Sequence, residues 1–128
     1  MEIQTETYGS TEIAVVQGHD RVIESLEDAM DLLGNASYLG TTAILARDVH
    51  FSPDFFRLRT GLAGEILQKF SNYRMKLVIT GDFSRYDGKA LKDFILESNR
   101  TGHILFAASA VEGVELLTGK KKPHGTVL

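Results

Sequence analysis

Two arginines and a threonine precede a pair of glycines near the middle of the chain: Arg57, Arg59 and Thr60 come before Gly61 and Gly64. Where a helix begins, unpaired N–H groups and the positive end of the dipole can hold an anion such as phosphate, with help from arginine. The spacing matches neither a P-loop nor a dinucleotide fingerprint. Each glycine costs about 1 kcal/mol of helix propensity relative to alanine, so the pair needs a compensating reason. Anion binding and close backbone packing both stay open as that reason.

A further candidate, Asp82, follows an apolar run at residues 75–80 that predicts a buried strand. In open α/β sheets ligands collect beyond the carboxyl ends of the strands, so Asp82 is a candidate ligand contact or acid/base group. The same end of the preceding strand carries residues 47–50, Arg-Asp-Val-His. Aspartate is also a frequent turn residue that bonds the nearby backbone, and we favour that role for Asp82.

Metal and nucleophile chemistry have little support in the sequence. Cysteine is absent and the four histidines are scattered, so no zinc signature exists. We expect a structural or solvent role for His50 and Asp48, whose spacing is not typical of metal ligands. A triad drawn from Ser52, His50 and Asp82 lacks the G-x-S-x-G nucleophile elbow. We therefore predict no catalytic residue, no metal and no cofactor, although enzymatic activity stays open.

The composition is that of one soluble globular domain. The chain has 128 residues, of which 43% are hydrophobic and 24% charged, and its net charge is -3. A chain without a basic field is not drawn to nucleic acid or to an anionic membrane. Neither a signal peptide nor an apolar run of about 20 residues is present. We expect a cytoplasmic domain at residues 1–119 and a basic, flexible tail at residues 120–128.

The pattern of apolar residues predicts the elements that position these groups. Alternation predicts a hairpin of strands 2–8 and 11–17 around Gly9-Ser10, and short apolar runs predict strands at 41–46, 75–80 and 103–107. Spacing of three to four residues between apolar positions predicts four helices. The first begins after Ser25 and stops at Gly34-Asn35, and the others lie at 55–70, 89–99 and 109–117. Alternatively, Ser52-Pro53-Asp54 caps a short helix and a second begins near Thr60.

The predicted order is β-β-α-β-α-β-α-β-α, which indicates a single α/β domain. Strands that alternate with helices require right-handed crossovers and a mostly parallel sheet, and the hairpin adds an antiparallel pair. We expect a central mixed sheet of about five strands with helices packed on it.

The run FFRLRTGLAGEILQKFSNYRMKLVITGDFS at residues 55–84, continued by ALKDFILESN at 90–99, resembles a bacterial family called domain of unknown function 4180. The likeness extends from about the first predicted strand to the fifth, and it implies no activity. More distantly, the element order is similar to that of STAS domains, found in anti-sigma-factor antagonists and sulfate-transporter tails. In STAS domains a kinase phosphorylates a hydroxyl in the motif Asp-Ser-Ser/Thr-Gly-Leu. The resemblance places this hydroxyl on Thr60. This chain departs from the motif because Leu58-Arg59 replaces its acidic start.

Our leading hypothesis is a non-catalytic regulatory or protein-interaction module whose surface combines Arg57, Arg59, Thr60 and Asp82 with the two glycines. The alternative is a small-molecule or anion-binding protein, or an enzyme, with a pocket at the start of the second helix. A third is a homodimer formed through the face of Gly61 and Gly64 or through an edge strand. The expected partner is thus a protein, a second copy of the chain or a small anion.

Overall fold

A mixed sheet with its strands in sequential order forms the centre of the molecule. The computed structural model describes residues 1–86 and 88–119, so the tail predicted at 120–128 lies outside the described residues. Within these ranges the sheet has the order β1-β2-β3-β4-β5, where β1 and β2 are antiparallel and every later pair is parallel. The strands are β1 Ile3–Tyr8, β2 Thr11–Val16, β3 Ala43–Arg47, β4 Lys76–Thr80 and β5 Ile104–Ala107.

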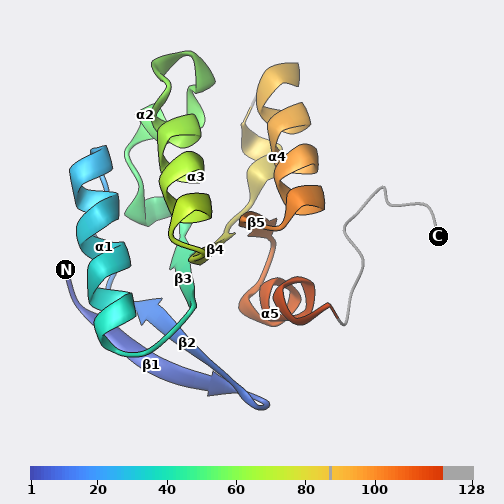
Figure 1. The fold of residues 1–128 in the computed structure, drawn as a ribbon. Helices are drawn as coiled ribbons and strands as arrows, with labels where there is room; N and C mark the ends of the chain where they lie inside the picture. The colour runs from blue at the N-terminus through green and yellow to red at the C-terminus, as the bar shows by residue number, and fades with distance from the viewer. Residues whose placement is uncertain (87, 120–128) are drawn as a thin grey trace.

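The helices lie on both faces of this sheet (Figure 1). The α-helices of the described residues are α1 Leu26–Tyr38, α2 Pro53–Phe56, α3 Leu62–Asn72, α4 Lys89–Thr101 and α5 Ala110–Thr118, and the short 3-10 turns are η1 Asp48–His50, η2 Leu58–Thr60 and η3 Phe83–Arg85. Right-handed crossovers between strands that follow in sequence all pass over the same face, so α1, α3 and α4 share one face and α5 covers the other. The predicted α/β domain is confirmed.

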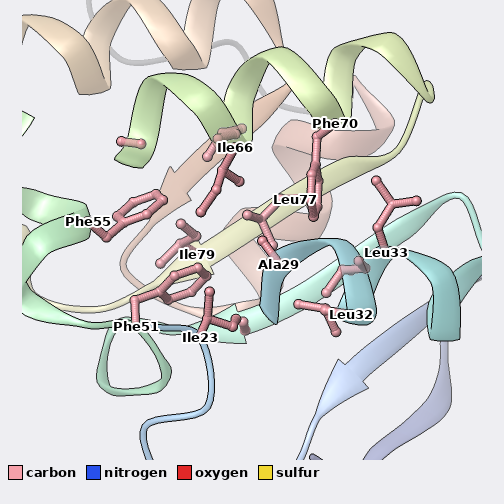
Figure 2. Packing of buried hydrophobic residues seen from close by; sticks show 14 of the residues in the cluster. Ile23, Ala29, Leu32, Leu33, Phe51, Phe55, Ile66, Phe70, Leu77 and Ile79 are labelled. Carbon is pink, nitrogen blue, oxygen red and sulfur yellow. The ribbon is translucent and has the colours of Figure 1, made fainter. Parts of the chain in front are cut away.

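The larger core lies between the sheet and α1, α3 and α4 (Figure 2). Its side chains alternate along the inner strands: Ile44 and Leu77 face this core, whereas Leu45 and Val78 face α5. Both faces of β3 and β4 are therefore buried. This explains why these strands are continuous apolar runs rather than alternating ones.

The first predicted helix is longer than expected. Ser25 caps α1 as predicted, since its side chain accepts a hydrogen bond from the backbone N–H of Asp28. The helix then continues through Gly34 and Asn35, so the predicted stop there is wrong. It ends at Tyr38, with Leu39 as its C-cap, and Gly40 follows with a φ of 82°. Packing of the buried Ala36 against the core outweighs the weak helix propensity of Gly34 and Asn35.

The segment predicted as one helix at residues 55–70 is interrupted, as the alternative prediction held. Ser52 caps α2 by accepting a hydrogen bond from the N–H of Asp54, and proline occupies its first turn. The chain leaves α2 at Arg57, turns through η2, and enters α3 from Gly61. Gly61 has a φ of 82°, a conformation that glycine adopts without strain.

The edge of β5 is protected by a side chain of α4. The amide of Asn99 donates to the carbonyl oxygen of Phe106 at 3.2 Å and accepts from its N–H at 2.7 Å. Asn99 thereby makes the two hydrogen bonds that a sixth strand would make at this position. Because an open strand edge is a template for unwanted pairing, we infer that Asn99 helps to keep this edge closed.

Candidate functional site

A pocket of about 480 Å³ lies at the carboxyl ends of β3 and β4. Asp48, which directly follows β3, and Tyr86, in the segment after β4, line it together with Phe56 and Arg57 at the end of α2. Arg21 joins them from the loop before α1. That loop lies beside this site because the backbone around Ile23 pairs with that around Phe51.

Asp48 is the buried acid of the pocket. Its side chain is only 9% exposed, and its Oδ2 lies 2.5 Å from Nη2 of Arg85. The other carboxylate oxygen accepts no hydrogen bond from any residue that the structure describes. The carboxylate is held against the backbone of Gly81, where an added Cβ would lie 2.6 Å from Cγ of Asp48. Only glycine at position 81 leaves room for this acid.

Aromatic rings line one side of the pocket, and Arg85 contacts both Tyr86 and Asp48 of its lining. The rings of Phe56 and Tyr86 stack with centroids 4.6 Å apart. The guanidinium of Arg85 lies 5.1 Å from the Tyr86 centroid and donates to its hydroxyl at 3.2 Å. This hydrogen bond raises the pKa of Arg85, so its side chain is a permanent cation. With 55% of its side chain exposed, Arg85 covers Asp48 from the solvent side.

Two further cations line the pocket and hold only loose ion pairs. Arg57 lies 3.5 Å from Asp54, and Arg21 lies 3.9 Å from Glu24. All four of these side chains are more than half exposed. Pairs of this kind contribute little to stability, so either arginine can reorient toward a bound molecule at small cost.

A larger hollow of about 620 Å³ lies over α1, but its lining is less suited to recognition. Asp28, Asp31 and Asn35 supply its polar groups, and no basic residue lines it. The pocket at Asp48 is therefore the better candidate site.

A family model described as "Domain of unknown function (DUF4180)" matches residues 8–117. The chain belongs to this family. The match confirms the resemblance predicted from residues 55–84 and 90–99, and it includes every residue of the pocket described above. No curated protein and no solved structure matches the chain, and the predicted likeness to STAS domains finds no support here.

In this DUF4180 domain, only Arg57 of the six predicted site residues lines the pocket. Arg59, two residues later, is exposed and makes no ion pair with a described residue. The hydroxyl of Thr60 lies 2.7 Å and 2.9 Å from the carbonyl oxygens of Asp54 and Arg57 and accepts from the N–H of Leu62 at 3.3 Å. Thr60 thus stabilises the turn between α2 and α3.

The two glycines of the DUF4180 segment have different roles. Gly61 has a positive φ, which explains why glycine occupies this position. Close packing does not account for Gly64, because an added Cβ there would meet no described atom within 4 Å. Nothing in the packing of α3 explains the second glycine.

Asp82 serves as the turn residue that the sequence favours. Its Oδ1 accepts hydrogen bonds from the backbone N–H of Ser84 at 3.1 Å and from the Ser84 hydroxyl at 2.5 Å. These bonds lower the pKa of Asp82 and cap η3. Asp82 does not line the pocket. The rule that singled out Asp82, a polar residue just after a buried strand, applies equally to Asp48.

Sequence reasoning missed Arg21, which lies in the loop before α1, and it also missed Arg85 and Tyr86. Arg85 ends η3 and Tyr86 follows it, in a segment without apolar periodicity or a recognisable motif. Arg85 joins the site through a contact with Asp48, 37 positions away along the chain, and Tyr86 joins it through its stacking on Phe56. No local pattern could have revealed either contact.

His50 has a structural role, as expected. Nδ1 accepts from the N–H of Arg47 at 2.9 Å, and Nε2 lies 2.9 Å from the carbonyl oxygen of Gly18. The carbonyl oxygen of His50 accepts from the N–H groups of Val22 and Ile23, which fixes the loop that carries Arg21. Both ring nitrogens are used, so His50 cannot serve Ser52 as a base. Within residues 1–86 and 88–119, no group of three His, Asp or Glu side chains could hold a metal.

The buried His50 should make stability fall on acidification. Burial lowers its pKa from 6.5, and protonation of Nδ1 would break the bond to Arg47. The unfolded state then takes up the proton first, so unfolding free energy declines as pH falls below 6.5 toward the lower native pKa. As the pH falls below 6.5, the wild type should lose stability relative to a His50→Phe variant, by no more than about 1.4 kcal/mol per pH unit. Urea unfolding at several pH values checks this, and parallel profiles for both proteins would refute it.

No helix among the described residues has both the length and the apolar character needed to cross a membrane.

Proposed function

We propose that this DUF4180 domain binds a small organic anion in the pocket at the carboxyl ends of β3 and β4. The observation that carries the proposal is the pairing of Arg57 and Arg21 with apolar walls in one pocket of about 480 Å³. Pockets for small molecules are commonly of this size and combine apolar lining with a few polar groups. Their usual place in an open α/β sheet is where this one lies.

The arginines supply the anion-binding part of the site. A guanidinium can donate two parallel hydrogen bonds to one carboxylate or phosphate, which fixes the orientation of the bound group. Arg57 lies 3.5 Å from Asp54, beyond the usual hydrogen-bond length, so a ligand can compete for it. Phe51 and Phe56, which are buried and line the same pocket, provide an apolar surface for the rest of the ligand.

The regulatory or protein-interaction module predicted from the sequence has less support. Its switch depended on a hydroxyl at Thr60 that a kinase could modify. In the folded chain that hydroxyl bonds the backbone of Asp54, Arg57 and Leu62, and a phosphate would remove its donor to the carbonyl oxygens. The binding hypothesis uses groups that the fold leaves available, so we favour it.

The two neighbouring arginines provide a matched test. With 3-phenylpropionate as the probe, Arg57→Gln should weaken binding about tenfold or more, because a charge-assisted hydrogen bond contributes about 1.5–3 kcal/mol. Arg59→Gln should change affinity less than about twofold, since Arg59 lies outside the pocket. Titration calorimetry measures both, and thermal shifts with inorganic phosphate and other carboxylates extend the comparison.

The opposite result would locate the anion elsewhere. If Arg59→Gln weakens binding more than Arg57→Gln, the anion lies at the start of α3 rather than in the pocket. If no carboxylate or phosphate at millimolar concentration binds or shifts the melting temperature, the proposal is wrong.

A further inference from the structure

We propose that the molecule bound in this pocket carries a primary amine as well as its anionic group, and that the ammonium binds Asp48. The chemical class is a small zwitterion with an apolar body, such as an α-amino acid with an apolar side chain. This inference rests on the proposed function, because it takes the arginine side of the pocket as the anion site.

The buried carboxylate has unused acceptor capacity. An ionised carboxylate offers about four lone-pair positions, yet Asp48 accepts one hydrogen bond from the described residues, from Arg85. Its side chain is 9% exposed, so solvent reaches only a small part of the carboxylate. Burying a charge with few partners is costly. An ammonium group, which has three N–H donors, would supply what Asp48 lacks.

Arg85 is placed as a cover that a ligand can compete with. Its guanidinium donates a hydrogen bond to the hydroxyl of Tyr86 and lies over the ring of that residue, and its side chain is 55% exposed. It reaches Asp48 through Nη2 alone and bonds only Oδ2. A single hydrogen bond from an exposed side chain leaves the second oxygen of Asp48 for another donor.

The position of Asp48 is fixed before any ligand arrives. Gly81 lies so close that a Cβ there would come within 3.0 Å of three side-chain atoms of Asp48. The carboxylate therefore rests on the backbone of the segment after β4 and cannot retreat in that direction. A preorganised group loses little entropy on binding, which favours recognition.

The mixture of charges selects a molecule with both signs. A simple cation would be attracted by Asp48 but repelled by Arg21 and Arg57, which line the same pocket. A simple anion would bind the arginines and leave the second oxygen of Asp48 without a donor from a described residue. A zwitterion satisfies both sides, while Phe51 and Leu91 contact its apolar part.

Three probes that share one phenyl ring separate these cases. L-phenylalanine carries both charged groups, 3-phenylpropionate lacks the amine, and 2-phenylethylamine lacks the carboxylate. Calorimetry on the full chain should show L-phenylalanine binding about tenfold or more tighter than either analogue, since each lost charged hydrogen bond is worth about 1.5–3 kcal/mol.

Two variants should change the affinity for L-phenylalanine in opposite directions. Asp48→Asn removes the charge that holds the ammonium, so affinity should fall about tenfold, while 3-phenylpropionate should bind as before or more tightly. Arg85→Ala removes the competing cation, so affinity for L-phenylalanine should rise severalfold. Because Arg85→Ala leaves the buried Asp48 without its one described donor, some loss of stability is expected, so circular dichroism and urea unfolding first establish that the variant is folded under the conditions of the titration.

The outcomes distinguish this inference from the proposal beneath it. If 3-phenylpropionate binds as tightly as L-phenylalanine, the amine inference is overturned and the anion proposal stands. If none of the three probes binds, the amine inference is overturned, and if inorganic phosphate and the other carboxylates also fail to bind, the anion proposal is overturned with it. If Asp48→Asn does not fold, Arg85→Ala decides alone: weaker binding of L-phenylalanine would show that Arg85 assists the ligand rather than competing with it, and would overturn the inference.

Discussion

His50→Ala should lower the free energy of unfolding by about 3–5 kcal/mol, the largest loss that we expect from a single substitution in this domain. The imidazole is fully buried and is among the largest such side chains in the structure. Alanine would leave a cavity, and the N–H of Arg47 would lose its acceptor. Urea or thermal unfolding measures the loss.

Two further variants separate the causes. His50→Phe fills most of the cavity but cannot bond, so it should recover part of the lost stability and leave the cost of the unpaired N–H. His19→Ala, at an exposed histidine, should change stability by less than about 0.5 kcal/mol. If His50→Ala were no worse than His19→Ala, the structural role that we assign to His50 would be wrong.

Substitution of His50 should also affect binding at the candidate site. The backbone of His50 fixes Val22 and Ile23, and Ser52 bonds back to Ile23, so this short network holds the loop with Arg21 against α2. A phenyl ring at position 50 can keep these backbone bonds but loses the contact of Nε2 with the carbonyl oxygen of Gly18, so the loop that carries Arg21 is held less firmly. We therefore expect folded His50→Phe protein to bind 3-phenylpropionate more weakly than the wild type does.

Gly113→Ala should destabilise the domain by about 1–3 kcal/mol, although alanine is the better helix former. α5 packs so tightly on β4 that an added Cβ would lie 2.4 Å from Cγ1 of Val78. Val78 is fully buried and β-branched, so its methyl group cannot move aside without shifting the strand or the helix. Chemical unfolding of the purified variant gives the difference directly.

Gly34→Ala is the matched control because it places the same substitution inside another helix. An added Cβ at Gly34 meets no described atom within 4 Å, so this change should stabilise the domain by about 0.5–1 kcal/mol. A second substitution, Val78→Ala, should be less harmful in Gly113→Ala than in the wild type, since it makes room for the new methyl group. Equal effects of the two glycine substitutions would contradict the packing of α5 described above.

The order of elements was predictable because it depends on local patterns. Hydrophobic spacing and caps such as Ser25 and Ser109 act within a few residues, and the structure has both caps where the sequence predicts them. The end of α1 was not predictable from Gly34 and Asn35. A glycine stops a helix only when no tertiary contact favours its continuation, and here the buried Ala36 provides one.

The candidate site was only half predictable. Arg57 stood out by its residue type and by its place before a helix, and it lines the pocket. Asp82 satisfied the rule for strand ends but turned its side chain to Ser84, whereas Asp48, which satisfies the same rule, became the buried acid. The rule identifies an edge of the sheet, and it does not say which side chain at that edge points into a pocket.

The sequence by itself determined that this chain is one α/β domain with a mixed sheet, and it was sufficient to indicate the DUF4180 family. These properties follow from periodicities and motifs that are read along the chain. Only the tertiary structure decided which groups form the site. Asp48, Gly81 and Arg85 meet because β3 and β4 are neighbours in the sheet and their carboxyl ends point the same way. Contacts of that kind depend on distance in space, which a single sequence does not record.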